Sequence, residues 1–265
     1  MLRPKKVIDS IVEYANIQGR WNLPNFKYTS WLEISDRLPD NRTEEAYMIK
    51  SLTYYTNGEL AEFREYAAKL HDISNTWTAI SIYMTSLHTN GMIKEAINVF
   101  NDYIKNENCT TIDPSILHSH MTHCRWALEN DSLKECYSRF RKDINNSLKE
   151  NMEHTIAYND RDLELLNYVG IDKNLFLEVM GVAIKTLSEF GNFTIGFDLN
   201  CKHPNDDLMI NIFSDGIDYA LMNELNEEWL DKIVDHDSEY GFKQLSRLLV
   251  NFQPANSNDG DKYAN

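Results

Sequence analysis

An internal repeat between residues 43 and 144 constrains the fold more than any other feature of the sequence. In each of three segments, a run of about thirteen residues with an apolar stripe reaches Asn-Gly or Asn-Asp, and a second apolar run follows. The segments begin at Thr43, Thr76 and Ile116, and their turn asparagines are Asn57, Asn90 and Asn130, at spacings of 33 and then 40 residues. Apolar residues at helical spacing predict helices, so each segment is expected to form a helical hairpin. Because one short hairpin cannot bury its apolar face alone, the hairpins are expected to stack.

The turns and second helices of the hairpins share further positions. Gly58 and Gly91 can adopt the positive φ that ends a helix. In the third hairpin, a side-chain oxygen of Asp131 or Ser132 is expected to cap the second helix. The expected buried stripe of the second helices consists of Phe63, Ala96 and Cys136 and, four residues later, Ala67, Phe100 and Phe140.

The segment from Thr76 to about Asn108 resembles a tetratricopeptide repeat. The residues that match the packing positions of that family are Ile80, Tyr83, Met84, Leu87, Gly91, Ala96 and Phe100. The first segment departs from the pattern at Lys50, and the second lacks the proline with which the family ends each unit. The three segments cover under half of the chain. Pentatricopeptide repeats, which bind RNA, have a similar pattern, but the acidic charge of this chain argues against them.

In tetratricopeptide proteins the first helix of each hairpin lines a concave groove. Carried over by position, the resemblance implies a groove formed by Glu45, Met48, Leu52, Tyr55, Thr78, Ser81, Thr85, His88, His118, Met121, Arg125 and Leu128. Such a groove suits an extended peptide or a partner helix, with Tyr55 as the aromatic anchor to test first. The alternative is a solvent-exposed helix face that binds nothing.

Further helices are expected on both sides of the repeat. Residues 4–18 and 28–38 favour helices before it, and a helix after it should end at Gly170. The next helix is expected to begin with Asp172 as its cap and to close at Gly191.

The period of the apolar residues then changes. Residues 193–200 alternate between apolar and polar and predict a half-buried strand, and a second strand is expected over 208–216. Helices are expected over 217–234 and 238–246, and residues 247–254 form either a third strand or a continuation of the helix. The predicted fold is therefore mainly α, with a solenoid of helical hairpins and a small C-terminal α/β element that has a two- to three-stranded sheet. The expected domains are a helical repeat domain over 1–170, the α/β element over 171–254, and a disordered tail over 255–265.

The chain is acidic, with 26 Lys and Arg against 41 Asp and Glu and a formal net charge of −15. Binding to nucleic acid is disfavoured because it needs clustered basic residues. Residues 198–239 contain twelve Asp or Glu against Lys202 and Lys232. This stretch is either a solvated surface or a docking surface for a basic partner. The second interpretation supports an alternative function, that of an immunity-type antagonist that masks a basic toxin or enzyme surface.

One cluster of metal-ligand side chains stands out, at His118, His120, His123 and Cys124. The spacing on a helix would allow zinc binding, and a metal-dependent enzyme is a further alternative. At a shift of 40 residues, however, His120, His123 and Cys124 match the packing residues Ile80, Tyr83 and Met84. We therefore expect core residues, no metal and no cofactor. Phosphate-binding glycine loops and nucleophile elbows are also absent from the sequence, so an enzyme is not expected.

The remaining predictions concern location. Neither a secretory leader nor a run of 18 apolar residues is found, which argues against export and against a membrane span. The four cysteines lack the C-x-x-C spacing and are expected to be free thiols in the reducing cytoplasm. The sequence thus predicts a cytoplasmic scaffold for protein–protein interaction that binds a peptide or a partner protein, and a basic partner would complement the acidic charge of the chain.

Overall fold

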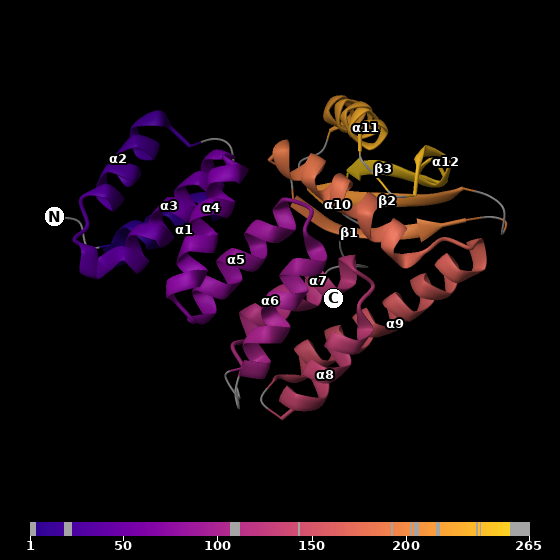
Figure 1. Ribbon diagram of the computed structural model, residues 1–265, viewed down its shortest axis with the longest axis horizontal. Helices are drawn as coiled ribbons and strands as arrows, with labels where there is room; N and C mark the ends of the chain where they lie inside the picture. Colours follow the sequence, from indigo (N-terminus) through magenta and orange to yellow (C-terminus); the bar gives the residue numbers. More distant parts are fainter. Residues whose placement is uncertain are drawn as a thin grey trace. The chain divides into compact units, whose positions relative to one another are not determined.

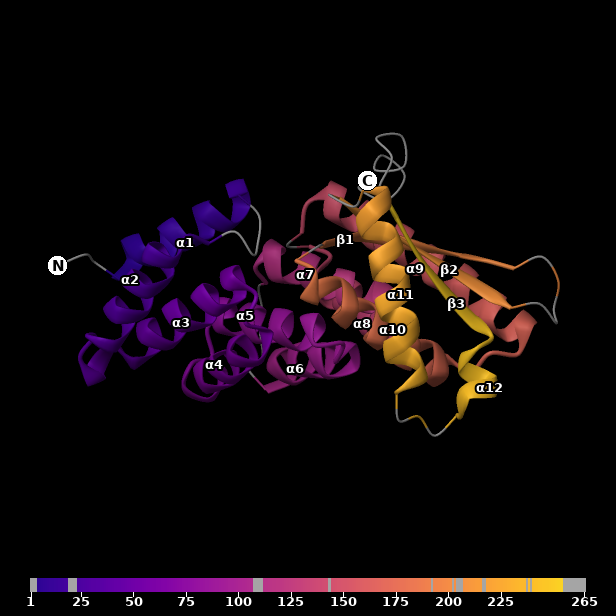
Figure 2. The same ribbon diagram turned by 90° about the horizontal axis from the view of Figure 1, so that it is seen from above.

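Helices make up most of the computed structural model, which describes residues 4–18, 23–106, 112–142, 144–191, 193–201, 203, 207–215, 218–236, 238 and 240–254. In these residues twelve α-helices accompany a three-stranded sheet near the C-terminus (Figures 1 and 2). The prediction of a mainly α fold with a small α/β element is confirmed. Contacts group the chain into two compact units, Met1–Asn90 and Gly91–Asn265. The domain boundary predicted at 170/171 lies inside the second unit and stays a prediction, and the tail over 255–265 lies outside the described residues.

The first unit is helical throughout. Its elements are α1 (Pro4–Gln18), α2 (Asn25–Asp36), a 3-10 turn (Asp40–Arg42), α3 (Thr43–Asn57), α4 (Leu60–Ile73) and α5 (Trp77–Thr89). Gly58 adopts a φ of 86° directly after α3, as expected for a helix-ending glycine. The hydroxyl of Thr76 accepts a hydrogen bond from the backbone N–H of Ala79 and caps α5. The α3–α4 hairpin closes over a core in which Phe63 and Ala67 are fully buried.

The second unit begins with helices and continues into the sheet. Its helices are α6 (Ile93–Asn106), α7 (Pro114–Trp126), α8 (Asn130–Phe140), α9 (Asn146–Val169), α10 (Lys173–Glu189), α11 (Tyr219–Val234) and α12 (Phe242–Leu245). The stripe predicted for the second helices is confirmed, since Phe63, Ala67, Ala96, Phe100, Cys136 and Phe140 are all buried. Asp172 caps α10 as predicted, because its carboxylate accepts hydrogen bonds from the N–H groups of Asn174 and Leu175.

The third turn lies three residues earlier than predicted. Helix α8 already begins at Asn130, and its cap is Glu129, so the prediction of Asp131 or Ser132 as the cap was wrong. The left-handed residue of this turn is Leu128, with a φ of 49°, and it lies 37 residues after the left-handed Gly91. A leucine in this conformation carries none of the Gly or Asn signal from which a turn is predicted.

The sheet has the strand order β1 (Phe193–Asn200), β2 (Leu208–Asp215) and β3 (Leu248–Pro254). Strands β1 and β2 are antiparallel, β2 and β3 are parallel, and the third strand is thereby confirmed. A register shift between Thr194 and Gly196 interrupts the expected alternation of β1. Helices α10 and α11 pack against each other and against the sheet, and they cover one of its faces (Figure 1).

Helix α10 also approaches the backbone at Gly91. A Cβ atom on Gly181 would lie 2.7 Å from the carbonyl oxygen of Gly91, closer than real Cβ contacts allow. Only glycine therefore permits this packing, in which two backbones touch without intervening side chains.

No helix in the described part of the chain has both the length and the apolar composition that crossing a membrane requires.

Candidate functional site

A cleft of about 360 Å³ lies between α6, α8 and α10 of the second unit. The wall from α6 consists of Lys94, Ile97, Asn98 and Asn101. Residues three, four and seven positions apart lie on one face of a helix, so the sequence of α6 brings these four side chains together. Ile97 is buried in the floor, whereas Lys94 and Asn98 are exposed at the rim.

The second wall comes from α8 and the turn before it. Asp131, Ser132 and Glu135 contribute from the helix, and Ala127 and Glu129 contribute from the turn. The Oε1 atom of Glu129 accepts a hydrogen bond from the N–H of Asp131 at 3.3 Å, which fixes the start of α8. Asp131 and Glu135 are exposed and one helical turn apart, so both carboxylates lie on the same side of α8.

The third wall is the first turn of α10, with Lys173, Asn174 and Leu177. The Nζ atom of Lys173 lies 2.9 Å from Oε2 of Glu129, so this ion pair joins the second and third walls. Both partners are about one-third exposed, and the pair contributes little to stability.

The floor of the cleft connects to a buried polar chain. Ser132 donates its hydroxyl proton to Oδ1 of Asn101 at 2.6 Å, and its oxygen lies 2.8 Å from Nε2 of His120. A hydroxyl has one proton, so the ring must donate its Nε2–H to Ser132. His120 is fully buried, and its burial lowers its pKa to about 3 and keeps the ring neutral. Because the histidine is the donor, it does not act as a base toward Ser132 in this arrangement.

The prediction that His120, His123 and Cys124 are core residues is confirmed. All three are buried, and the His120 ring stacks on Phe100 with centroids 3.8 Å apart. The Sγ atom of Cys124 lies 3.3 Å from Nε2 of His120, and burial raises the pKa of this thiol well above its ordinary value. Within the described residues, no three His, Cys, Asp or Glu side chains are grouped so that they could hold a metal ion.

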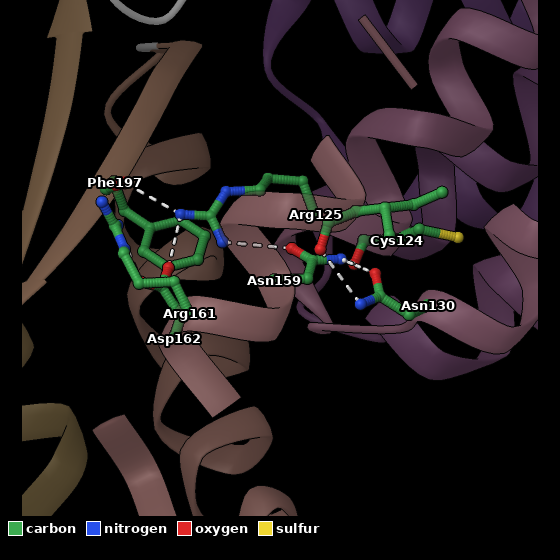
Figure 3. Close-up of polar contacts among 8 residues, drawn as sticks. Cys124, Arg125, Asn130, Asn159, Arg161, Asp162 and Phe197 are labelled. Carbon is green, nitrogen blue, oxygen red and sulfur yellow. Dashed lines mark hydrogen bonds and ion pairs between the residues drawn. The ribbon is translucent and has the colours of Figure 1, made fainter. Parts of the chain in front are cut away.

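Arg125 anchors a second polar network, in which its side chain reaches from α7 toward α9 and β1 (Figure 3). Its guanidinium donates to Oδ2 of Asp162 at 2.7 Å, to Oδ1 of Asn159 at 3.1 Å and to the carbonyl of Phe197 at 3.3 Å. It also lies over the Phe197 ring, 4.0 Å from the centroid. Desolvation by burial lowers the pKa of Arg125, and the charge of Asp162 opposes that effect.

Asn159 extends this network to the turn between α7 and α8. Its Nδ2 group donates to the carbonyl of Cys124 at 3.2 Å and to Oδ1 of Asn130 at 3.0 Å. Asn130 in turn donates to Asp160 at 2.6 Å. The network therefore fixes the unusual turn at Leu128 and connects it to α9 and β1.

The predicted groove residues are divided between the two units. Met48, Leu52, Tyr55, Ser81, Thr85 and His88 lie in α3 and α5 of the first unit, with Glu45 and Thr78, whereas His118, Met121, Arg125 and Leu128 belong to the second. Their assembly into one groove stays a prediction.

Individual environments differ within this set. Tyr55 is half-buried against Phe63, with ring centroids 4.7 Å apart, and Met121 and Leu128 are buried. His118 is exposed. The guanidinium of Arg125 is already bound within the chain.

The predicted groove residues do not line the cleft between α6, α8 and α10. The analogy with tetratricopeptide proteins directed attention to the first helices, whereas two walls of the cleft belong to second helices. The third wall comes from α10, which lies beyond the repeat. The available signal was the row Lys94, Ile97, Asn98 and Asn101, a polar face beside a buried residue on one helix.

Comparison of the chain with models of known protein families, with curated proteins and with solved structures finds no match in any of the three.

Proposed function

We propose that this protein is a protein–protein interaction module that binds an extended segment of a partner protein in the cleft between α6, α8 and α10. The observation that supports this proposal is the cleft itself, which is open, walled by three helices and lined by donors and acceptors. Its volume of about 360 Å³ lies at the lower end of the range of ligand pockets, about 300–1,000 Å³, and suits a few residues of peptide.

The carboxamides of the lining favour a peptide as the ligand. Asn98, Asn101 and Asn174 each carry a donor and an acceptor, as does every peptide group of an extended chain. Helical walls hold such groups more precisely than loops do. Peptide recognition in this cleft needs no cofactor and no nucleic acid.

The wider setting remains the one that the sequence predicts. We propose helical hairpins of tetratricopeptide type, a cytoplasmic location and no catalytic activity. The location is supported by Cys124, Cys136 and Cys201, which are free thiols in the described part of the chain. The groove predicted on the first helices, with Thr78 and His118 as exposed members, is retained as a second surface to test.

The test is selection from a phage-displayed library of random dodecapeptides, followed by fluorescence polarisation with the selected peptides. Asn98→Trp places a large ring at the rim of the cleft and should abolish binding. Asn167→Trp is the matched control, because Asn167 is also an exposed helical asparagine but does not line the cleft. A His118→Trp variant tests the first-helix surface. Peptides that bind equally well to Asn98→Trp and Asn167→Trp would refute the proposed site.

The alternative function, an acidic antagonist, draws on the net charge of −15. Such a protein would bind a basic toxin or enzyme over a wide surface, and its association rate would fall steeply with ionic strength. Asn98→Trp separates the two functions, because an antagonist that binds over a wide acidic surface keeps its affinity for the basic partner, whereas a segment bound in the cleft loses it.

A further inference from the structure

The charges of the cleft are only partly balanced. Lys94 and Lys173 oppose Glu129, Asp131 and Glu135, which leaves one net negative charge in the lining. Lys173 is paired with Glu129. Among the described residues, neither Asp131 nor Glu135 has an ion-pair partner within 4.0 Å. Two carboxylates on one side of α8 therefore face the cleft rim without a cation of their own.

The lining also contains three apolar side chains. Ile97 and Ala127 are buried there, and Leu177 is half-buried on the opposite wall. A lysine or arginine side chain matches this arrangement of apolar residues beside carboxylates, because it has an aliphatic stem and a charged end. The stem can lie against Ile97 and Leu177 while the charged end stays at the hydrated rim. A carboxylate ligand would instead add a negative charge to a lining that is already negative.

We propose that the cleft selects partner segments by a lysine or arginine side chain, whose stem lies against Ile97, Ala127 and Leu177 and whose charge is bound by Asp131 and Glu135. The occupant is thus a basic, extended segment of a partner protein. Charge complementarity favours this occupant, because the lining carries a net negative charge and the whole chain carries a net charge of −15. This inference rests on the proposed function and specifies its ligand.

The experiment uses the full chain and the peptides that lose binding in Asn98→Trp. These cleft-dependent peptides should be enriched in Lys or Arg. Each is resynthesised with a fluorescein label, once as selected and once with the enriched basic residue replaced by Gln. We expect the Gln peptide to bind about fivefold more weakly, the upper end for an exposed ion pair.

Charge-neutral variants of the protein complete the comparison. Glu135→Gln and Asp131→Asn should each weaken the basic peptide about three- to fivefold and leave the Gln peptide unchanged. Glu227→Gln is the control, because Glu227 is an exposed helical glutamate on α11, away from the lining. Circular dichroism spectra of all variants should overlay, since the three side chains are exposed.

The outcomes separate the two claims. If cleft-dependent peptides show no enrichment in Lys or Arg, the inference is wrong and the proposed function stands. The same holds if Glu135→Gln and Asp131→Asn bind the basic peptide as well as Glu227→Gln does. If no selected peptide depends on the cleft, the proposed function fails and the inference fails with it.

Discussion

Replacing Asp162 by alanine should destabilise the second unit strongly, because Asp162 is the acidic centre of a buried network. Its side chain is 1% exposed, and the side chain of its partner Arg125 is 17% exposed. Removal of the carboxylate leaves Arg125 buried without its counter-charge. Breaking a buried pair in this way typically costs about 3–5 kcal/mol. Arg161, which also bonds Asp162, is 57% exposed and returns to water at little cost.

Removing both charges should recover much of the free energy of unfolding that Asp162→Ala loses. In Arg125→Met with Asp162→Leu, two apolar side chains of similar length replace the pair, a change that is often neutral or stabilising. The coupling energy of this double-mutant cycle should therefore exceed about 2 kcal/mol. Glu33→Ala is the control, since it breaks an exposed pair with Arg37 four residues along α2 and should cost no more than about 0.5 kcal/mol.

Hydrogen exchange at the backbone amides of α7, α9 and β1, measured by NMR, gives the free energy of opening around the network. This local measurement suits a chain with two compact units better than one global unfolding signal. If Asp162→Ala costs under about 1 kcal/mol, or if the double variant shows the sum of the two single losses, the network does not stabilise the unit in the way argued here.

Three further predictions concern other parts of the second unit. Because burial holds the pKa of His120 at about 3, the unfolded chain binds a proton below about pH 6.5 that the folded chain does not. His120 should therefore make stability fall by about 1.4 kcal/mol for each pH unit from about 6 to 4, and His120→Gln should reduce the slope by that amount in urea titrations. Gly181→Ala should destabilise the protein by about 1–3 kcal/mol in the same assay, since the new methyl group overlaps the Gly91 carbonyl and two backbones must separate. Iodoacetamide should label Cys201 in the folded protein and leave Cys124 unmodified, because the latter is buried with a raised pKa; equal labelling by mass spectrometry would contradict its burial.

Local sequence signals were sufficient for most of the fold. Asp172 was recognisable as a helix cap because a short carboxylate can accept hydrogen bonds from the N–H groups of the first turn. The third strand was recognisable from its β-branched and apolar residues, although the same residues could also continue a helix. Its parallel pairing with β2 could not be predicted, because that pairing depends on residues about 40 positions earlier in the chain.

Two features could not be predicted from the sequence: the turn at Leu128 and the assembly of the cleft. The positive φ of Leu128 belongs to a helix end closed by backbone bonds from Leu128 N–H to Arg125 and from Glu129 N–H to Cys124, and Asn159 also donates to the Cys124 carbonyl; a leucine gives no local signal for such a turn. The cleft is assembled from residues of three helices, and although the row on α6 marks one wall, no local pattern shows that α8 and α10 complete it. His120 and Cys124 were predictable as core although the third turn is offset by three residues, because residues three or four positions apart share a helix face and both therefore stay on the buried side of α7.

Helix α10 contributes both to the packing of the sheet and to the wall of the cleft. Its Phe176 packs against Phe197 of the sheet, while Lys173 and Leu177 complete the cleft. A chain cut after residue 170 would keep all the hairpins and yet lack one wall of the cleft. The hairpins and the α/β element therefore cannot be separated without loss of the cleft. A ligand that holds α10 in place also stabilises the sheet by mass action, by about 2.7 kcal/mol at a concentration of 100 Kd.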